Sequence, residues 1–129
     1  VGFHGSGRNM GQLTFGGPKL FHEMPDGGDY MNFVGDNNKR FLSGLRNHKD
    51  KFETDLRETG GMRLATTDEE MAKLEKEAVF IKRIRGIDCP LLSRRDLDSM
   101  LPSRNTFIGG LFIPNEATYN PYKIVNGIR

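Results

Sequence analysis

Residues 5 to 12 read GSGRNMGQ and place three glycines around a hydroxyl, a guanidinium and two amide side chains. Loops that bind a dinucleotide phosphate follow the pattern G-x-G-x-x-G between a strand and a helix. Here the third glycine, Gly11, comes one residue too late, and the glycines and proline at 16 to 18 interrupt any following helix. The stretch therefore predicts no phosphate loop. It predicts a main chain that bends sharply and can approach another group closely, because glycine has no side chain.

Four polar side chains in this stretch are able to bind a ligand: Ser6, Arg8, Asn9 and Gln12. Together they supply hydrogen-bond donors and acceptors. A polar surface loop has the same composition, and loops also carry much of protein function. A surface loop and a binding loop both stay open at this level.

Few other residues have the chemistry of a catalytic group. His4 is interpreted as a solvated loop histidine, with a place near a substrate as the alternative, and His22 has no partner at a characteristic spacing. His48 falls on an apolar helical face, which favours a packed side chain. The single cysteine, Cys89, excludes an internal disulfide and favours a small buried residue over a cofactor attachment point. No Cys/His pair has the spacing of a zinc site.

The composition is that of a globular domain. Of the 129 residues, 36% are hydrophobic and 28% are charged, which is enough for one domain with a core. The net charge of +2 and the scattered basic residues predict no nucleic-acid partner. No apolar run is long enough to span a membrane. No signal peptide is visible and the first residue is Val, so we expect a cytoplasmic or matrix-type protein whose start has been trimmed.

Residues 1 to 36 are rich in glycine and are expected to be irregular, with a turn or exposed loop at 24 to 30. A helix is expected next, and Gly60 and Gly61 end it. Its face repeats every three or four residues and consists of Phe41, Leu45, His48, Phe52 and Leu56.

Strands and helices alternate in the second half of the chain. A short strand at 62 to 64 places two apolar residues opposite Arg63. Thr67 followed by Glu70 predicts the start of a helix that Gly86 closes. The apolar stripe of that helix is Met71, Leu74, Ala78 and Ile81.

The last third of the chain predicts three more elements. Ser93 caps a short helix that stops before Pro102, and Asn120 with Pro121 begins a final helix. Residues 106 to 113 read as a strand with two glycines. We expect this strand to present an unpaired apolar edge, and hence self-association or a complementary chain that covers it.

Four stretches, in order along the chain, resemble the middle segment of FAD-dependent oxidoreductases of the D-amino acid oxidase superfamily, which includes sarcosine, glycine and γ-glutamylputrescine oxidases. They are GSGRNMGQ, GGMRLATTDEEMAKLE, LLSRRDLDSMLP and GGLFIPNEATYNPYKIV. The first resembles the flavin-contacting loop S-x-x-N-x-G. The SGRN-x-GQ form is most similar to the amine and γ-glutamylputrescine oxidase branch.

The resemblance implies an α+β fold: the substrate (cap) domain portion of a two-domain flavoprotein, with a mixed sheet and flanking helices. It implies a flavin-contacting loop region at 1–36 and a cap-domain portion at 37–129, together one incomplete domain. The dinucleotide-binding Rossmann unit that holds the adenosine of FAD is expected to be missing. We therefore expect a fragment or one chain of a split enzyme, inactive alone and with weak or absent FAD binding.

The resemblance also implies a function. The complete protein would oxidise an amine or amino acid by hydride transfer to FAD. The residues implied in flavin contact are Ser6, Gly7, Arg8, Asn9, Met10, Gly11 and Gln12. The alternative is a non-catalytic structural or interaction subunit derived from such an enzyme. No catalytic residue and no metal ligand is assigned.

Overall fold

The computed structural model describes residues 11–15, 19–51, 53–101 and 106–127. These residues form four α-helices, a short 3-10 helix (η1) and two small sheets, so the predicted α+β class is confirmed. The elements in chain order are β1 (Gln12–Leu13), η1 (Phe21–Glu23), α2 (Gly27–Asn47), β2 (Gly61–Ala65), α3 (Asp68–Arg85), β3 (Leu91–Ser93), α4 (Arg94–Met100), β4 (Gly109–Ile113), β5 (Ala117–Thr118) and α5 (Pro121–Gly127).

The two sheets are separate, and β4 of one is followed along the chain by β5 of the other. The larger has the order β2-β4-β3 and the smaller pairs β1 with β5. Every pair of named strands in the described part of the chain is antiparallel, where the resemblance implied a mixed sheet. The expectation of an unpaired edge at 106–113 was wrong, because β4 is the central strand and β2 and β3 form the edges.

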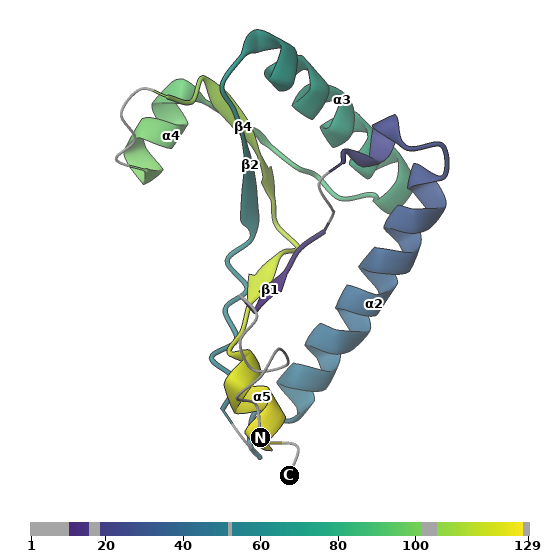
Figure 1. Ribbon diagram of the computed structural model, residues 1–129, viewed down its shortest axis with the longest axis vertical. Coiled ribbons are helices and arrows are strands. Elements are labelled where there is room, and N and C mark those ends of the chain that lie inside the picture. Colours follow the sequence, from purple (N-terminus) through teal and green to yellow (C-terminus); the bar gives the residue numbers. More distant parts are fainter. Residues whose placement is uncertain (1–10, 16–18, 52, 102–105, 128–129) are drawn as a thin grey trace.

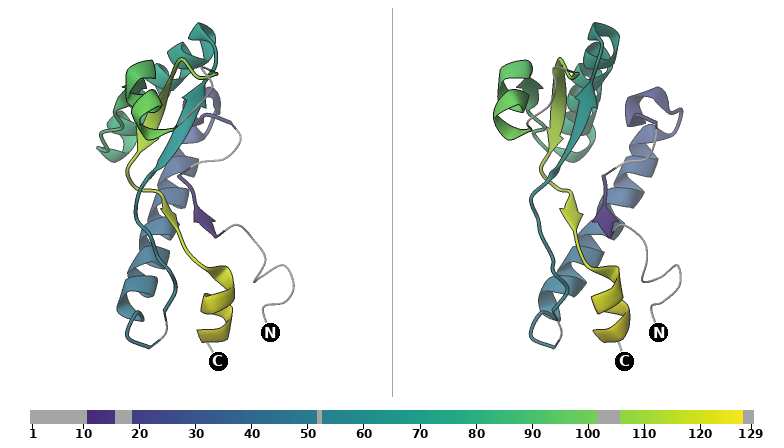
Figure 2. Two further views of the ribbon diagram at one scale, coloured as in Figure 1. Left: turned by 90° about the vertical axis from the view of Figure 1, so that its left-hand side faces the viewer. Right: turned by 60° about the vertical axis from the view of Figure 1, so that its left-hand side comes forward.

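The helices occupy distinct positions around these sheets (Figure 1). Figure 2 shows α3 and α4 on opposite faces of the three-stranded sheet. Helix α2 runs from η1, near one end of α3, down to the level of α5. The smaller sheet lies between the three-stranded sheet and α5, so β1 is at the joint between the two halves of the molecule.

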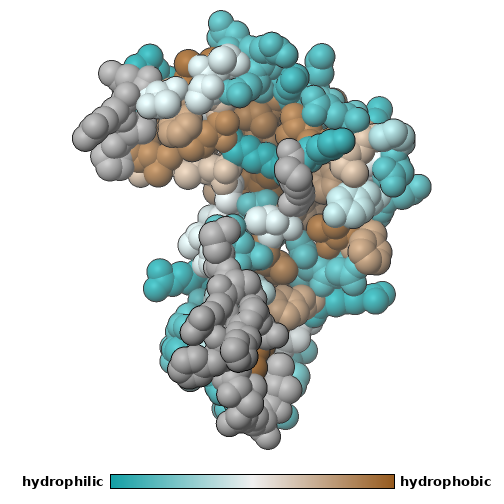
Figure 3. All heavy atoms as spheres, in the orientation of Figure 1, coloured by the Kyte–Doolittle hydropathy of each residue, from teal (hydrophilic) through white to brown (hydrophobic). Residues whose placement is uncertain are grey.

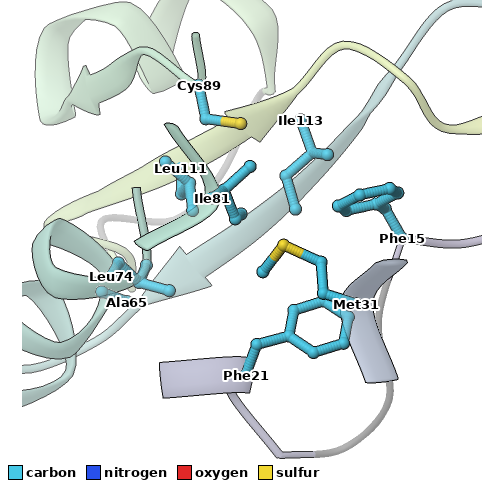
Figure 4. Close-up of a cluster of buried hydrophobic side chains, with 9 residues drawn as sticks. All are labelled: Phe15, Phe21, Met31, Ala65, Leu74, Ile81, Cys89, Leu111 and Ile113. Carbon is cyan, nitrogen blue, oxygen red and sulfur yellow. The ribbon is translucent and has the colours of Figure 1, made fainter. Parts of the chain in front are cut away.

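One core cluster fills the space between the three-stranded sheet, α3 and the start of α2. Figure 4 shows side chains from all these elements pointing toward one another. Its buried members are Phe15, Phe21, Met31, Ala65, Leu74, Ile81, Cys89, Leu111 and Ile113. Burial of this apolar surface is the main force that joins these elements.

The first helix begins earlier than the sequence predicted. The expected loop at 24–30 contains the first turn of α2, which starts at Gly27. A Cβ at Gly27 would overlap the carbonyl oxygen of Phe21, so this glycine serves close packing of η1 on the helix and not a turn. Position 36 therefore lies inside α2, while the division into two functional regions at that position stays a prediction.

The same helix also ends earlier, at Asn47 and not at Gly60. His48 is its exposed C-terminal cap, and its Nδ1–H donates to the Gly44 carbonyl at 2.8 Å, so the prediction of a packed His48 was wrong. Leu56 lies outside any helix or strand, and Phe52 falls outside the described residues. The buried residues of α2 are Gly27, Met31, Gly35, Leu42 and Leu45.

The predicted helix termini in the second half are confirmed. The Thr67 hydroxyl accepts from the Glu70 amide, and Gly86 ends α3 with a left-handed φ of 67°. Ser93 begins α4 with a complete capping box to Asp96, and the Asn120 side chain accepts from the third residue of α5. These ends were predictable because capping is local.

Several apolar side chains of the upper half remain exposed. Met62 of β2, Leu91 of β3 and Met100 of α4 are 37%, 43% and 57% exposed. Figure 3 shows apolar surface gathered along this half of the molecule, beneath α4. Self-association through such a surface stays a prediction. Among the described residues, no helix is long and apolar enough to cross a membrane.

Candidate functional site

The structure describes only the last two residues of the predicted flavin-contacting stretch, Gly11 and Gln12. The residues outside the described part are Ser6, Gly7, Arg8, Asn9 and Met10. The geometry of the site is therefore given from Gly11 onward.

Gly11 is buried and has a left-handed φ of 60°. A Cβ here would overlap the carbonyl oxygen of Tyr119 and lie 2.9 Å from the Pro121 ring. The Gly11 carbonyl in turn accepts from the Tyr119 amide at 2.8 Å. Both the backbone conformation and the close approach thus require glycine. Contacts with Tyr119 and Pro121 of the same chain require glycine at position 11, whether or not a ligand is bound.

Gln12 follows as the first residue of β1 and pairs with Thr118 of β5. It is exposed, so its amide is accessible at the edge of the small sheet. A carboxamide offers both a donor and an acceptor, and a flavin ring edge presents both kinds of partner. The chemistry of Gln12 therefore fits a contact with flavin or with substrate.

Strand β5 is held on its other side as well. The amides of Arg57 and Thr118 donate to one another's carbonyls at 2.8 and 2.9 Å, and the Asn120 amide donates to the Thr54 carbonyl at 2.7 Å. Residues 54–57 thus bond to one side of the segment that contains β5, and β1 bonds to its other side. Main-chain hydrogen bonds from these two neighbouring segments therefore hold Gln12 in position.

Charged side chains reinforce this backing next to α5. Asp55 has a left-handed φ of 53°. Its carboxylate accepts from Lys123 Nζ at 2.7 Å and from the side-chain amide of Asn120 at 3.0 Å. These hydrogen bonds, that of Lys123 foremost, lower the pKa of Asp55, and the same bond to Asp55 raises the pKa of Lys123. The pair holds the main chain at Asp55 in a conformation that non-glycine residues rarely adopt.

A cavity of about 360 Å³ opens beside Phe15, between α2 and the turn after β4. Its lining mixes apolar residues with charges of both signs, including Lys39, Arg46, Glu58 and Glu116. Arg46 pairs with Glu58, which lowers the pKa of Glu58 through that hydrogen bond. No residue of this cavity was predicted from the sequence.

The sequence also missed Glu77, which is fully buried in α3. Its carboxylate accepts from the main-chain amides of Phe21 at 2.8 Å and His22 at 3.0 Å, and from His22 Nδ1 at 2.7 Å. Arg63 approaches it at 3.9 Å, so this side chain of β2 turns toward α3 while Met62 is exposed. The signal was available, because Glu77 stands three residues after Leu74 and four before Ile81, on the apolar stripe.

Cys89 is buried, as predicted, and belongs to the core cluster. Burial, followed by the nearby charge of Asp88, raises the pKa of its thiol to about 11. The described residues contain no group of three His, Cys, Asp or Glu side chains that could hold a metal ion.

Comparison with known proteins decides the family. The family model described as FAD dependent oxidoreductase (DAO) matches residues 1–129. The chain belongs to this family. No curated protein matches the sequence significantly.

Three solved structures share the fold. Glycine oxidase from Geobacillus kaustophilus superposes on 95% of the chain with a TM-score of 0.76 and 18% identity. Glycine oxidase from Bacillus cereus ATCC 14579 does so on 95% with a TM-score of 0.70 and 14% identity, and L-proline dehydrogenase from P. horikoshii on 70% with a TM-score of 0.56 and 16% identity. The chain spans about a third of the glycine oxidases, 32% of each, and 24% of the dehydrogenase.

Proposed function

We propose that this chain forms the flavin- and substrate-facing part of an enzyme that oxidises an amine or amino acid. The observation that carries the proposal is the match of the FAD-dependent family model over residues 1–129. The similar solved structures are glycine oxidases and an L-proline dehydrogenase, whose names state that they act on amino acids. A cytoplasmic location belongs to the same proposal.

When bound in the complete protein, FAD would supply the hydride-accepting chemistry for oxidation at the carbon next to the substrate nitrogen, and the resulting imine would be hydrolysed by water. The residues of this chain would bind the flavin and orient the substrate. Ser6, Arg8 and Asn9 would hydrogen-bond the flavin, with Gly7 and Met10 in the same loop. Gln12, exposed on β1, would sit at the edge of the substrate cavity. Gly11 would set the direction in which the chain leaves the flavin, since its carbonyl is bonded to Tyr119.

The test uses the complete flavoprotein that contains this chain. Flavin absorbance is recorded after gel filtration, and the protein is then mixed anaerobically with a panel of amines and amino acids. We expect bound flavin and loss of its absorbance with at least one compound. A protein that carries no flavin, or whose flavin none of these compounds reduces, would refute the proposal and favour the structural or interaction subunit.

Variants of the loop separate flavin contact from folding. Arg8→Ala should lower the flavin reduction potential and slow reduction, because a cation near the ring stabilises the anionic reduced form. Gln12→Ala should raise the substrate KM or slow reduction. Asn37→Ala is a matched amide-removing control, since Asn37 is exposed on α2 and, among the described residues, bonds the Phe33 carbonyl one turn back. If Arg8→Ala and Gln12→Ala had the same reduction potential, reduction rate and KM as Asn37→Ala, the loop would not contact flavin or substrate.

A further inference from the structure

A turn separates β4 from β5 directly beside β1. Strand β2 pairs with β4 up to Gly61 and Ile113, and pairing resumes between Arg57 and Thr118. Between these pairs the first segment has three residues, 58 to 60, and the second has four, 114 to 117, with a turn at 114–115. Gly60 has a left-handed φ of 75°, and its amide donates to the Glu116 carbonyl at 3.0 Å.

Glu116 directly follows this turn. Its Oε1 accepts from the main-chain amide of Phe15 at 2.7 Å, across 101 residues of sequence. Its Oε2 lies over Gly61, where any Cβ would overlap it. Glycine at position 61 thus leaves the room that this carboxylate occupies.

The contact extends the short ladder between β1 and β5. Gln12 and Leu13 pair with Thr118 and Ala117 through main-chain atoms, and Gly11 is bonded to Tyr119. At Phe15 a carboxylate takes the place of a main-chain acceptor. The segment from Gly11 to Phe15 is consequently hydrogen-bonded at both ends to residues 116–119, which include β5. Phe15 itself is 2% exposed and packs in the core.

We propose that Glu116 is a positioning residue for the flavin loop. By holding Phe15 against the turn after β4, it fixes the position of the segment from Gly11 to Phe15 and the face on which Gln12 is presented. This role rests on the proposed function, because it requires that residues 6 to 12 contact flavin. Glu116 acts through the main chain and does not itself touch the cofactor.

The test compares Glu116→Ala with Glu116→Gln in the complete flavoprotein. Glutamine keeps a carbonyl oxygen that can accept from Phe15, whereas alanine leaves this amide without an acceptor. Two quantities are measured: hydrogen exchange of the Phe15 amide and the Kd for FAD after removal and re-addition of the cofactor. Thr67→Ala is the matched control, because it destabilises the α3 cap far from the loop.

We expect Glu116→Ala to accelerate Phe15 exchange and to raise the FAD Kd about five- to twentyfold. Glu116→Gln should stay within about twofold of wild type in both, and Thr67→Ala should lose stability without a change in FAD Kd. Unchanged exchange at Phe15 in the alanine variant would show that the bond is absent and overturn the proposal. Faster exchange with an unchanged FAD Kd, or an equal loss of affinity in Thr67→Ala, would overturn the positioning role.

The two proposals fail in different measurements. If the wild-type complete protein binds no FAD, the proposed function is refuted and the positioning role falls with it, while Phe15 exchange still reports whether Glu116 holds the chain. If the wild type binds FAD and only the Glu116 comparison fails, the proposed function stands.

Discussion

The buried carboxylate of Glu77 offers the sharpest test of how this fold is held together. Substitution by glutamine preserves the shape and keeps one carbonyl oxygen for the Phe21 amide, which is 2.8 Å from Oε1. The second oxygen becomes an NH₂ group that faces two donors of His22, now 3.0 and 2.7 Å from Oε2. The imidazole can adapt by moving its proton to Nε2 and accepting at Nδ1. The main-chain amide of His22 cannot adapt.

The magnitude follows from that single donor. The His22 contact is partly buried, and an amide left without an acceptor there costs about 1–3 kcal/mol. Loss of charge on the acceptor adds to this cost, because hydrogen bonds to an ionised group are roughly twice as strong as neutral ones. Arg63, at 3.9 Å and with 20% of its side chain exposed, can turn toward water and adds little. We therefore expect Glu77→Gln to lower the free energy of unfolding by about 2–3 kcal/mol.

The assay is denaturant unfolding followed by circular dichroism, with the slope compared between variants. Glu75→Gln, two residues away and exposed, is the control and should stay within about 0.5 kcal/mol of wild type. Glu77→Ala, which removes every acceptor, should be more damaging than Glu77→Gln. A value for Glu77→Gln within about 0.5 kcal/mol of the control would refute the inference that this carboxylate anchors η1 to α3.

Three further predictions concern other parts of the chain. Gly11→Ala should destabilise the protein by at least about 1–3 kcal/mol, because it puts a side chain at positive φ against the Tyr119 carbonyl; an unchanged unfolding midpoint would contradict this. Cys89, whose pKa is raised to about 11, should react with a disulfide reagent at pH about 8 roughly a hundredfold more slowly than in denaturant; equal rates would show an accessible thiolate. The pKa of Asp55 is lowered in the folded state, so its contribution to stability is present above its ordinary pKa and is lost as the pH falls through the lowered value. The difference in unfolding free energy between wild type and Asp55→Asn should therefore shrink from pH about 5 to about 2, and a constant difference would contradict the Lys123 pairing.

The sequence alone determined those features whose causes are local. Thr67 and Ser93 begin helices because a hydroxyl accepts from an amide three residues on. Gly86 ends α3 because glycine adopts a left-handed φ without strain. Four motifs in the correct order also indicated the family, which the family model confirms. None of these inferences needs knowledge of a residue far away in the chain.

Tertiary structure alone decided which glycines and carboxylates serve packing. Gly27 reads as a loop residue in the sequence but lies inside α2, because its missing side chain admits the Phe21 carbonyl. The spacing of Glu77 on the apolar stripe indicates its burial but not its partners, and Glu116 reads as a surface acid, yet each accepts a main-chain amide from a segment more than 50 residues away. The partners depend on a turn between two sheets and on packing of η1 on α3, which local spacing does not encode. The path of the chain away from the predicted flavin loop is thus set by distant carboxylates, since the two residue pairs of β1 and β5 are too few to hold it by themselves.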